Sequence, residues 1–191
     1  MAETFKLIKS CSDYNIFSEL TKDEYKVMRK RIIECVLATD MTFHAKQFTY
    51  LKLKIEKLGI NKGKNLDKLF ESLDNMQIYS TQQEFMNIMI HTCDISNPTK
   101  PWNIYNQWVD KVMEEFWKQG DREKQLNLPV SFLCDRVTVT KAGAQIGFID
   151  GIILPFLTAF TEIFPELSFL MENAVKNKNK FKEIKEEENK K

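Results

Sequence analysis

Glycine and proline are scarce in this sequence, which contains six and five of them among 191 residues. Folds built from many short strands need these residues in their turns, so the scarcity argues against an all-β fold and favours long helices. Histidine is scarcer still, because His44 and His91 are the only two. The four cysteines are scattered without a close pair, which argues against a zinc finger or a disulfide scaffold.

The chain also lacks an excess of either charge. It has 28 Lys and Arg against 27 Asp and Glu, for a formal net charge of +1. This balance gives no reason to expect a nucleic-acid partner. The first residues show no signal-peptide pattern. We therefore expect reduced thiols and a cytoplasmic protein, with any membrane tether supplied by regions outside this chain.

Residues 146–164 are apolar and long enough to cross a bilayer. The stretch contains Asp150 and Glu162, and a charge at the bilayer centre costs roughly 3 kcal/mol. Pro155 in its middle would also bend a helix. A buried core helix kinked at Pro155 is the favoured interpretation, and a membrane span is the alternative.

Apolar residues recur at helical spacing along most of the chain. Capping boxes at Thr21–Glu24 and Thr81–Glu84 predict two helix starts, while Gly59 and Gly120 predict two helix ends. The predicted helices cover residues 22–36, 44–58, 66–73, 82–94, 102–117, about 140–164 and 166–175. Residues 61–65 are predicted to form a polar loop.

Three further features concern packing. The apolar stripe of residues 102–117 is wide, so this helix should be buried on more than one side. Gly143, Gly147 and Gly151 lie four apart, which predicts a groove where another helix backbone approaches closely. Residues 176–191 are almost all Lys, Glu and Asn, which predicts a frayed, solvated tail. The sequence thus predicts an all-α, compact multi-helix bundle over residues 1–175, followed by this tail.

Asp94 lies in the last turn of a predicted helix, just before Asn97 and Pro98. The negative end of the helix dipole is an unfavourable place for a carboxylate unless a cation offsets it, and carboxylates bind hard cations. The alternative is structural: His91 is a capped core histidine, and Asp94 bonds nearby amides. His44, on an apolar stripe, is more simply a packing histidine than a ligand.

Gln145 and Phe148 lie three apart, so they share a helix face. An amide beside a flat ring can hydrogen-bond and stack a purine. By spacing alone, the simpler interpretation is a core phenylalanine beside a surface glutamine, and both interpretations stay open.

Five ordered motifs resemble the catalytic domain of class I 3′,5′-cyclic nucleotide phosphodiesterases. They are LATDM (37–41) followed by His44, HTCDISNPTKPW (91–102), WVDKVMEEFWKQGDRE (108–123), PVSFLCDR (129–136) and AQIGFID (144–150). The resemblance runs from about residue 5 to residue 175. It implies that the bundle is the carboxy-terminal part of a phosphodiesterase-type domain.

The resemblance implies a role for seven residues. Asp94 would be a ligand of the tightly held metal, and Met41 would lie near the metal side of the cleft. Gln145 would hydrogen-bond the purine edge, with Phe148 on one face of the base and Val112 on the other. Asn97 and Tyr105 would line the base pocket.

The same resemblance implies two divalent metals, zinc with magnesium or manganese, that lower the pKa of a shared water. The resulting hydroxide attacks phosphorus, and a histidine protonates the departing 3′ oxygen of cAMP or cGMP, which gives the 5′-monophosphate. In the family, that histidine and the other metal ligands precede the segment that residues 3–8 resemble. One aspartate cannot hold a catalytic zinc alone, because three protein ligands are the usual minimum. The isolated chain is therefore expected to be inactive.

Two hypotheses follow. In the first, the chain is part of a phosphodiesterase, and its partners are a cyclic nucleotide and the amino-terminal part of the catalytic domain. In the second, it is a truncated, non-catalytic homologue that acts as a purine-binding or protein-interaction module. The sequence leaves the preference between cAMP and cGMP open, and also whether the protein forms a homodimer.

Overall fold

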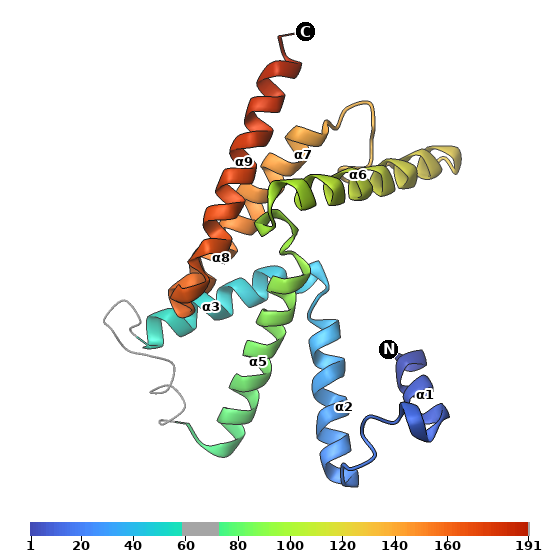
Figure 1. Ribbon diagram of the computed structural model, residues 1–191, viewed down its shortest axis with the longest axis vertical. Helices are drawn as coiled ribbons and strands as arrows, with labels where there is room; N and C mark the ends of the chain where they lie inside the picture. Colours follow the sequence, from blue (N-terminus) through green and yellow to red (C-terminus); the bar gives the residue numbers. More distant parts are fainter. Residues whose placement is uncertain (59–72, 191) are drawn as a thin grey trace. The chain divides into compact units, whose positions relative to one another are not determined.

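The computed structural model describes residues 1–58 and 73–190, and these residues contain helices and turns but no strand (Figure 1). The predicted all-α class is confirmed. The described residues form two compact units, each considered by itself: unit 1 has residues 1–47 and 73–94, and unit 2 has residues 48–58 and 95–190. Gly59, the predicted loop 61–65 and nearly all of the predicted helix 66–73 lie outside the described residues.

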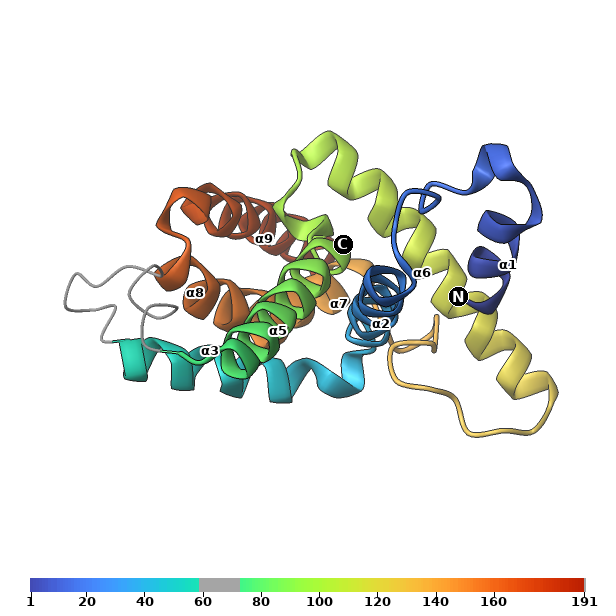
Figure 2. The same cartoon turned by 90° about the horizontal axis from the view of Figure 1, so that it is seen from below.

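Unit 1 is built around two long helices, α2 (Lys22–Leu37) and α5 (Asn75–Asp94). A loop with the short turn η1 (Ser12–Tyr14) connects α1 (Ala2–Ser10) to α2 (Figure 2). The ring of Phe5 in α1 is nearly buried and lies 5.0 Å from the Arg29 guanidinium of α2. A second short turn, η2 (Met41–Phe43), leads into α3 (His44–Leu58).

The helix starts in unit 1 test the two predicted capping boxes. At Thr21 the prediction is confirmed: the Thr21 hydroxyl accepts from the Glu24 backbone N–H, and the Glu24 carboxylate accepts from the Thr21 N–H. The box at Thr81 is wrong, because α5 begins six residues earlier and buries Thr81 in its interior. At the actual start of α5, the Asp74 carboxylate accepts from the Gln77 N–H at 2.8 Å, and the Gln77 amide oxygen accepts from the Asp74 N–H at 3.3 Å.

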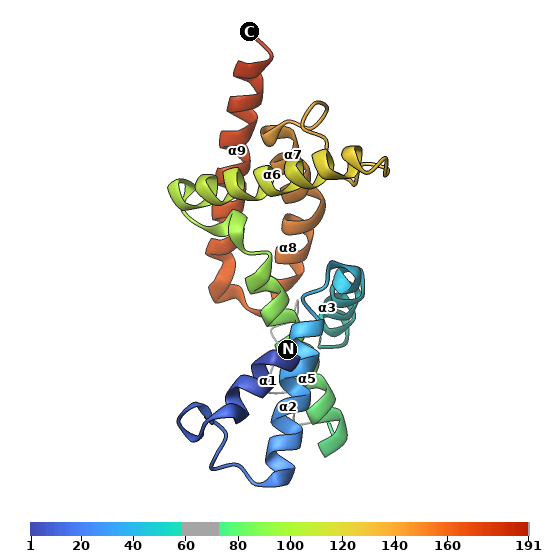
Figure 3. The same ribbon diagram turned by 90° about the vertical axis from the view of Figure 1, so that its right-hand side faces the viewer.

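Unit 2 contains α6 (Trp102–Gln125), α7 (Lys141–Phe148), α8 (Leu154–Ile163) and α9 (Ser168–Glu188), with the later turns of α3. Helices α7 and α8 lie along α9, and α6 crosses α7 (Figures 1 and 3). The core side chains between them are at most 2% exposed: Tyr105, Val109, Met113, Ile149, Ile153, Phe156, Leu157 and Phe181.

Helices α7 and α8 form one continuous helical segment, joined by the π-helical turn η5 (Ile149–Ile153). This turn comes just before Pro155, which cannot donate a backbone hydrogen bond, and a π turn accommodates such an interruption. By length and composition alone, Lys141–Ile163 could cross a membrane. Its Ile149, Ile153 and Phe156 are at most 1% exposed, which fits the predicted core helix.

Helix α6 corrects two predictions. Gly120 does not end the helix, which continues to Gln125. A Cβ built at Gly120 would lie 1.9 Å from the backbone oxygen of Cys134, so glycine here allows a close approach of two backbones. The wide apolar stripe is not buried on several sides, because Trp108 and Val112 are 54% and 37% exposed.

The glycines of α7 and η5 do not receive another helix among the described residues. A Cβ at Gly147 or Gly151 would meet nothing within 4 Å, and one at Gly143 would meet only the Thr140 hydroxyl of its own helix cap. The predicted groove is present, because all three glycines line one, but no other helix within residues 1–58 and 73–190 approaches them closely.

The predicted frayed tail is also wrong. Helix α9 continues to Glu188, well beyond residue 175, and buries Asn177 and Phe181. The buried positions Ala174, Asn177 and Phe181 are three and four residues apart, which places them on one helix face. The surrounding lysines and glutamates obscured this stripe in the sequence.

Candidate base-binding and metal-ligand residues

Tyr105 of α6 and Gln145 of α7 meet inside unit 2. The Tyr105 hydroxyl donates a hydrogen bond of 2.8 Å to the Gln145 amide oxygen, Oε1. Tyr105 is fully buried and Gln145 is 7% exposed. Burial raises the pKa of Tyr105 well above its ordinary value, so the phenol remains protonated and keeps its donor role.

The start of α7 is fixed to α6 by ionic contacts. The Lys141 ammonium donates to Asp110 at 2.7 Å and to Asn106 at 3.2 Å. The Thr140 hydroxyl caps α7 by accepting from the Gly143 N–H at 3.1 Å. These contacts hold the turn that carries Gln145 at a defined position on α6.

The contacts of the Gln145 amide give its two ends different roles. Its oxygen is occupied by Tyr105, whereas its nitrogen Nε2 lies 3.8 Å from the Met113 sulfur, a weak acceptor. The nitrogen is therefore the end that can offer a strong hydrogen bond to a ligand. The sequence identified Gln145 and Tyr105 but could not give the direction of the hydrogen bond between them.

Phe148, three residues after Gln145, is half-buried and lines a groove of about 570 Å³. Its wall is formed by α7, η5, the loop before α7 and Lys185 of α9, and it includes Gly143, Gly147, Gly151, Phe132 and Leu133. Neither Gln145 nor Val112 lines this groove. The structure thus joins Tyr105 to Gln145, and the clamp formed by Val112 and Phe148 stays a prediction.

Asn97 begins the short turn η4 (Asn97–Thr99), which α9 holds in place. The Asn177 side-chain amide donates to the backbone oxygens of Pro98 and Lys100, each at 2.8 Å. The amide oxygen of Asn97 is buried and has no hydrogen-bond partner among the described residues. Met41 begins η2 in unit 1 and is 44% exposed.

Asp94 ends α5 and is exposed, whereas His91, one turn earlier, is fully buried. The Nε2 atom of His91 lies 2.9 Å from Nδ1 of His44. Burial, reinforced by the neighbouring His44, lowers the pKa of His91, while Asp94 acts in the opposite direction. Burial also lowers the pKa of His44. His44 and His91 therefore form a packed pair in which the pKa of each imidazole lies below its ordinary value.

The described residues do not by themselves fit a catalytic metal. Within residues 1–58 and 73–190, no group of three or more His, Cys, Asp and Glu side chains could hold one ion. A catalytic zinc needs about three protein ligands. Asp94 could therefore supply only one ligand of such a site.

The histidine pair predicts how unit 1 responds to acid. In the folded chain, both histidines have a pKa below the ordinary 6.5. The unfolded chain therefore binds protons more readily, so the free energy of unfolding is highest above pH 6.5 and falls as the pH drops below it. We expect the melting temperature to fall between pH 7.5 and 5.5. A His44→Asn/His91→Asn double variant should show a smaller fall, and an equal fall in both proteins would contradict this prediction.

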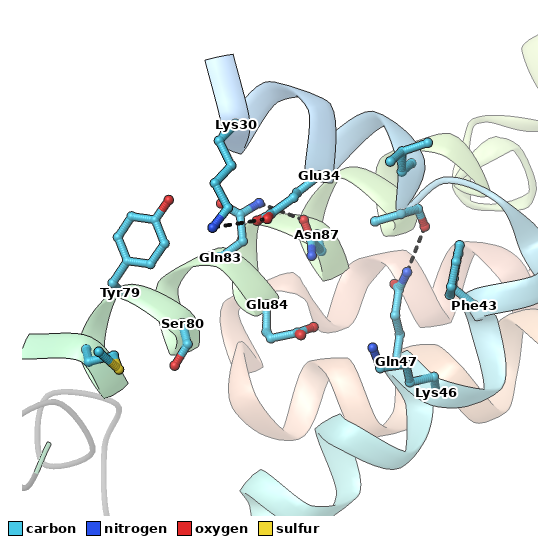
Figure 4. Close-up of a pocket in the computed structure, with 13 residues that line it drawn as sticks. Lys30, Glu34, Phe43, Lys46, Gln47, Tyr79, Ser80, Gln83, Glu84 and Asn87 are labelled. Atoms are coloured by element: carbon cyan, nitrogen blue, oxygen red, sulfur yellow. Dashed lines mark hydrogen bonds and ion pairs between the residues drawn. The ribbon is translucent and has the colours of Figure 1, made fainter. Parts of the chain in front are cut away.

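A second concave feature lies in unit 1, and no sequence pattern pointed to it. Figure 4 shows this pocket of about 420 Å³ between α2, α5 and the start of α3. Lys30 and Glu34 of α2 form an ion pair on one side, and Gln47 of α3 donates to the Ala38 backbone oxygen at 2.7 Å on the other. None of the seven predicted site residues lines it.

Comparison with known proteins shows extensive similarity to phosphodiesterases. Residues 1–174 match the family model described as 3′5′-cyclic nucleotide phosphodiesterase. A probable 3′,5′-cyclic phosphodiesterase, pde-1 of Caenorhabditis elegans, is 38% identical over 167 residues, which cover 87% of this chain and 22% of the relative. The dual specificity calcium/calmodulin-dependent enzyme 1B of Homo sapiens is 37% identical over 163 residues, or 85% of this chain and 27% of the relative.

Solved structures give the same result. The phosphodiesterase domain of a RhoPDE fusion protein from the choanoflagellate Salpingoeca rosetta superposes with a TM-score of 0.80 at 26% identity, over 95% of this chain and 54% of that one. The structure of LmjPDEB1 in complex with IBMX gives 0.76 at 27% identity, over 93% and 49%. The chain thus spans about a quarter of its curated relatives and about half of these solved chains. It belongs to the 3′,5′-cyclic nucleotide phosphodiesterase family.

Proposed function

We propose that this chain supplies the base-recognising part of a phosphodiesterase that hydrolyses the 3′-phosphoester of cAMP, cGMP or both to the 5′-monophosphate. The observation that carries the proposal is the buried hydrogen bond from Tyr105 to Gln145 in a member of this family. It fixes an amide whose nitrogen can donate to a ring acceptor. Adenine N1 and guanine O6 are both such acceptors, so this geometry is compatible with either base.

Asp94 is proposed as one ligand of a divalent metal, zinc at the tighter site with magnesium or manganese beside it. When bound, such metals activate water and neutralise charge on the phosphate. The remaining ligands would come from polypeptide outside the described part of this chain. Helix α2 has an apolar surface on which further polypeptide could pack, because Val27, Val36 and Leu37 are 44%, 46% and 57% exposed. Under this proposal, additional polypeptide of the catalytic domain covers that apolar surface.

The proposal is tested by steady-state hydrolysis of both cyclic nucleotides by the native polypeptide that contains these residues. Gln145→Ala should raise KM for both substrates by about 10-fold or more with a smaller change in kcat, because a base contact acts mainly on binding. An unchanged KM for both substrates would remove Gln145 from base recognition.

Tyr105→Phe gives a finer test of the same amide. The variant keeps the ring but frees the Gln145 oxygen, so the amide can turn and no longer presents its nitrogen in one orientation. We expect KM for both substrates to rise by about 3–10-fold, the cost of one hydrogen bond. Tyr14→Phe, the same change at a tyrosine that is 57% exposed, is the matched control and should leave KM unchanged.

The non-catalytic alternative is favoured by one observation, the absence of three clustered metal ligands in the described residues. A purine-binding module would bind cyclic nucleotides without turnover. Its affinity for cyclic nucleotides would depend on Gln145 and would not depend on Asp94. Turnover by the native polypeptide excludes this alternative.

A further inference from the structure

The second half of α9 contacts Tyr105 and the neighbours of two other candidate base-binding residues, although it lies beyond residues 1–174 that match the family model. Its buried face carries Asn177 and Phe181, which are 3% and 0% exposed, and Lys178, whose side chain is 16% exposed. Such burial of a charge-rich helix end indicates a defined role in the fold of unit 2.

Phe181 packs directly on the tyrosine that holds Gln145. Its ring centroid lies 5.6 Å from that of Tyr105 at an interplanar angle of 89°, an edge-to-face contact. It also lies 4.9 Å from the Trp102 ring at 62°. Tyr105 therefore donates to Gln145 from a ring that Phe181 contacts directly.

Two neighbouring contacts connect α9 to other candidate residues. The Lys178 ammonium pairs with Asp150 at 2.8 Å, two residues after Phe148. Asn177 donates to the carbonyls of Pro98 and Lys100, next to Asn97. One turn of α9 therefore holds the segments that carry Phe148, Asn97 and, through Phe181, Gln145.

We propose that residues 177–181 of α9 are a positioning element for base recognition, and that Phe181 sets the orientation of the Gln145 amide through Tyr105. Phe181 acts through its neighbour and does not itself touch the base. The expected effect of Phe181 on nucleotide affinity rests on the proposed function, whereas its expected effect on the orientation of the Gln145 amide does not.

The first test observes the amide directly in the 191-residue chain. The side-chain NH₂ resonances of Gln145, assigned by their loss in Gln145→Ala, are recorded by ¹⁵N NMR. Phe181→Leu keeps an apolar side chain but removes the ring edge, and it is a smaller loss of volume than a change to alanine. We expect it to shift these resonances in the same direction as Tyr105→Phe. Lys182→Ala, at the adjacent exposed position, is the control and should leave them in place.

Unchanged Gln145 resonances in Phe181→Leu, together with a shift in Tyr105→Phe, would overturn the proposal. Should Phe181→Leu fail to fold, Phe181→Met provides the same comparison with a more adaptable side chain. A melting curve for each variant establishes that the comparison is between folded proteins.

The second test measures dissociation constants for cAMP and cGMP. Phe181→Leu and Tyr105→Phe should each weaken binding by about 3–10-fold, and the double variant should be no weaker than Tyr105→Phe alone, because both changes act through one hydrogen bond. Multiplicative weakening in the double variant would show independent effects and overturn the proposal. If the unmodified chain binds neither nucleotide, base recognition by this chain fails, and the NMR comparison still decides the positioning role.

Discussion

Asp94→Ala is expected to lower cyclic nucleotide hydrolysis by the native polypeptide by more than the roughly 10–100-fold that loss of an outer-shell metal partner costs. The carboxylate is exposed at the last residue of α5, at the negative end of that helix, where a bound cation would offset the unfavourable charge. Asp94→Asn keeps the shape but removes the charge, so it should lose nearly as much activity. Metal content, measured by atomic emission, should fall together with the rate.

Asp23→Ala is the matched control for this prediction. Asp23 is another exposed carboxylate of unit 1, 90% accessible and paired with Lys26 at 3.0 Å. Its loss should leave both the rate and the metal content unchanged. Retention of activity and metal by Asp94→Ala would remove the proposed ligand role, even if the family assignment stands.

Gly120→Ala is expected to destabilise the chain by about 1–3 kcal/mol, the usual cost of overpacking. Helix propensity predicts the opposite sign, because alanine is favoured over glycine by about 1 kcal/mol in a helix interior. The steric effect should be larger than the gain in helix propensity, because the new methyl would lie 1.9 Å from the backbone oxygen of Cys134. A backbone oxygen cannot move aside like a flexible side chain. Urea denaturation of the 191-residue chain measures the difference.

Gly147→Ala is the matched change in α7, where a new Cβ meets nothing within 4 Å. It should stabilise the chain by about 0.5–1 kcal/mol, because only the backbone preference operates. The two substitutions are chemically identical and should have opposite signs. Equal effects at the two positions would show that the approach of Cys134 to Gly120 does not control stability.

The secondary structure was largely predictable from local patterns, and its errors have identifiable causes. The capping pattern at Thr21 gave a correct helix start, whereas the same pattern at Thr81 did not. Asp74 and Gln77 form a competing cap seven residues earlier, and local sequence does not show which of two caps starts the helix. Gly120 looked like a helix end because the close approach of Cys134 involves residues distant in sequence.

The candidate site was predictable only in part. Tyr105 and Gln145 were identified by resemblance, but their hydrogen bond joins residues 40 positions apart and depends on how α6 crosses α7. Phe181 was missed because its charged neighbours suggested a solvated tail. A helical spacing check on Ala174, Asn177 and Phe181 would have indicated a buried face.

The π-helical turn between α7 and α8 also accommodates one additional residue in this segment. Such a turn contains one residue more than an α-helix would place there, and each residue of an α-helix rotates the next side chain by about 100°. Deleting a single residue from positions 149–153 would therefore restore a regular helix and keep the Gln145 face in its relation to the face that carries Phe156, whereas a deletion within α7 or α8 would turn the two faces apart by about 100°. The segment therefore tolerates a change of one residue at this turn and at no other place between Gln145 and Phe156.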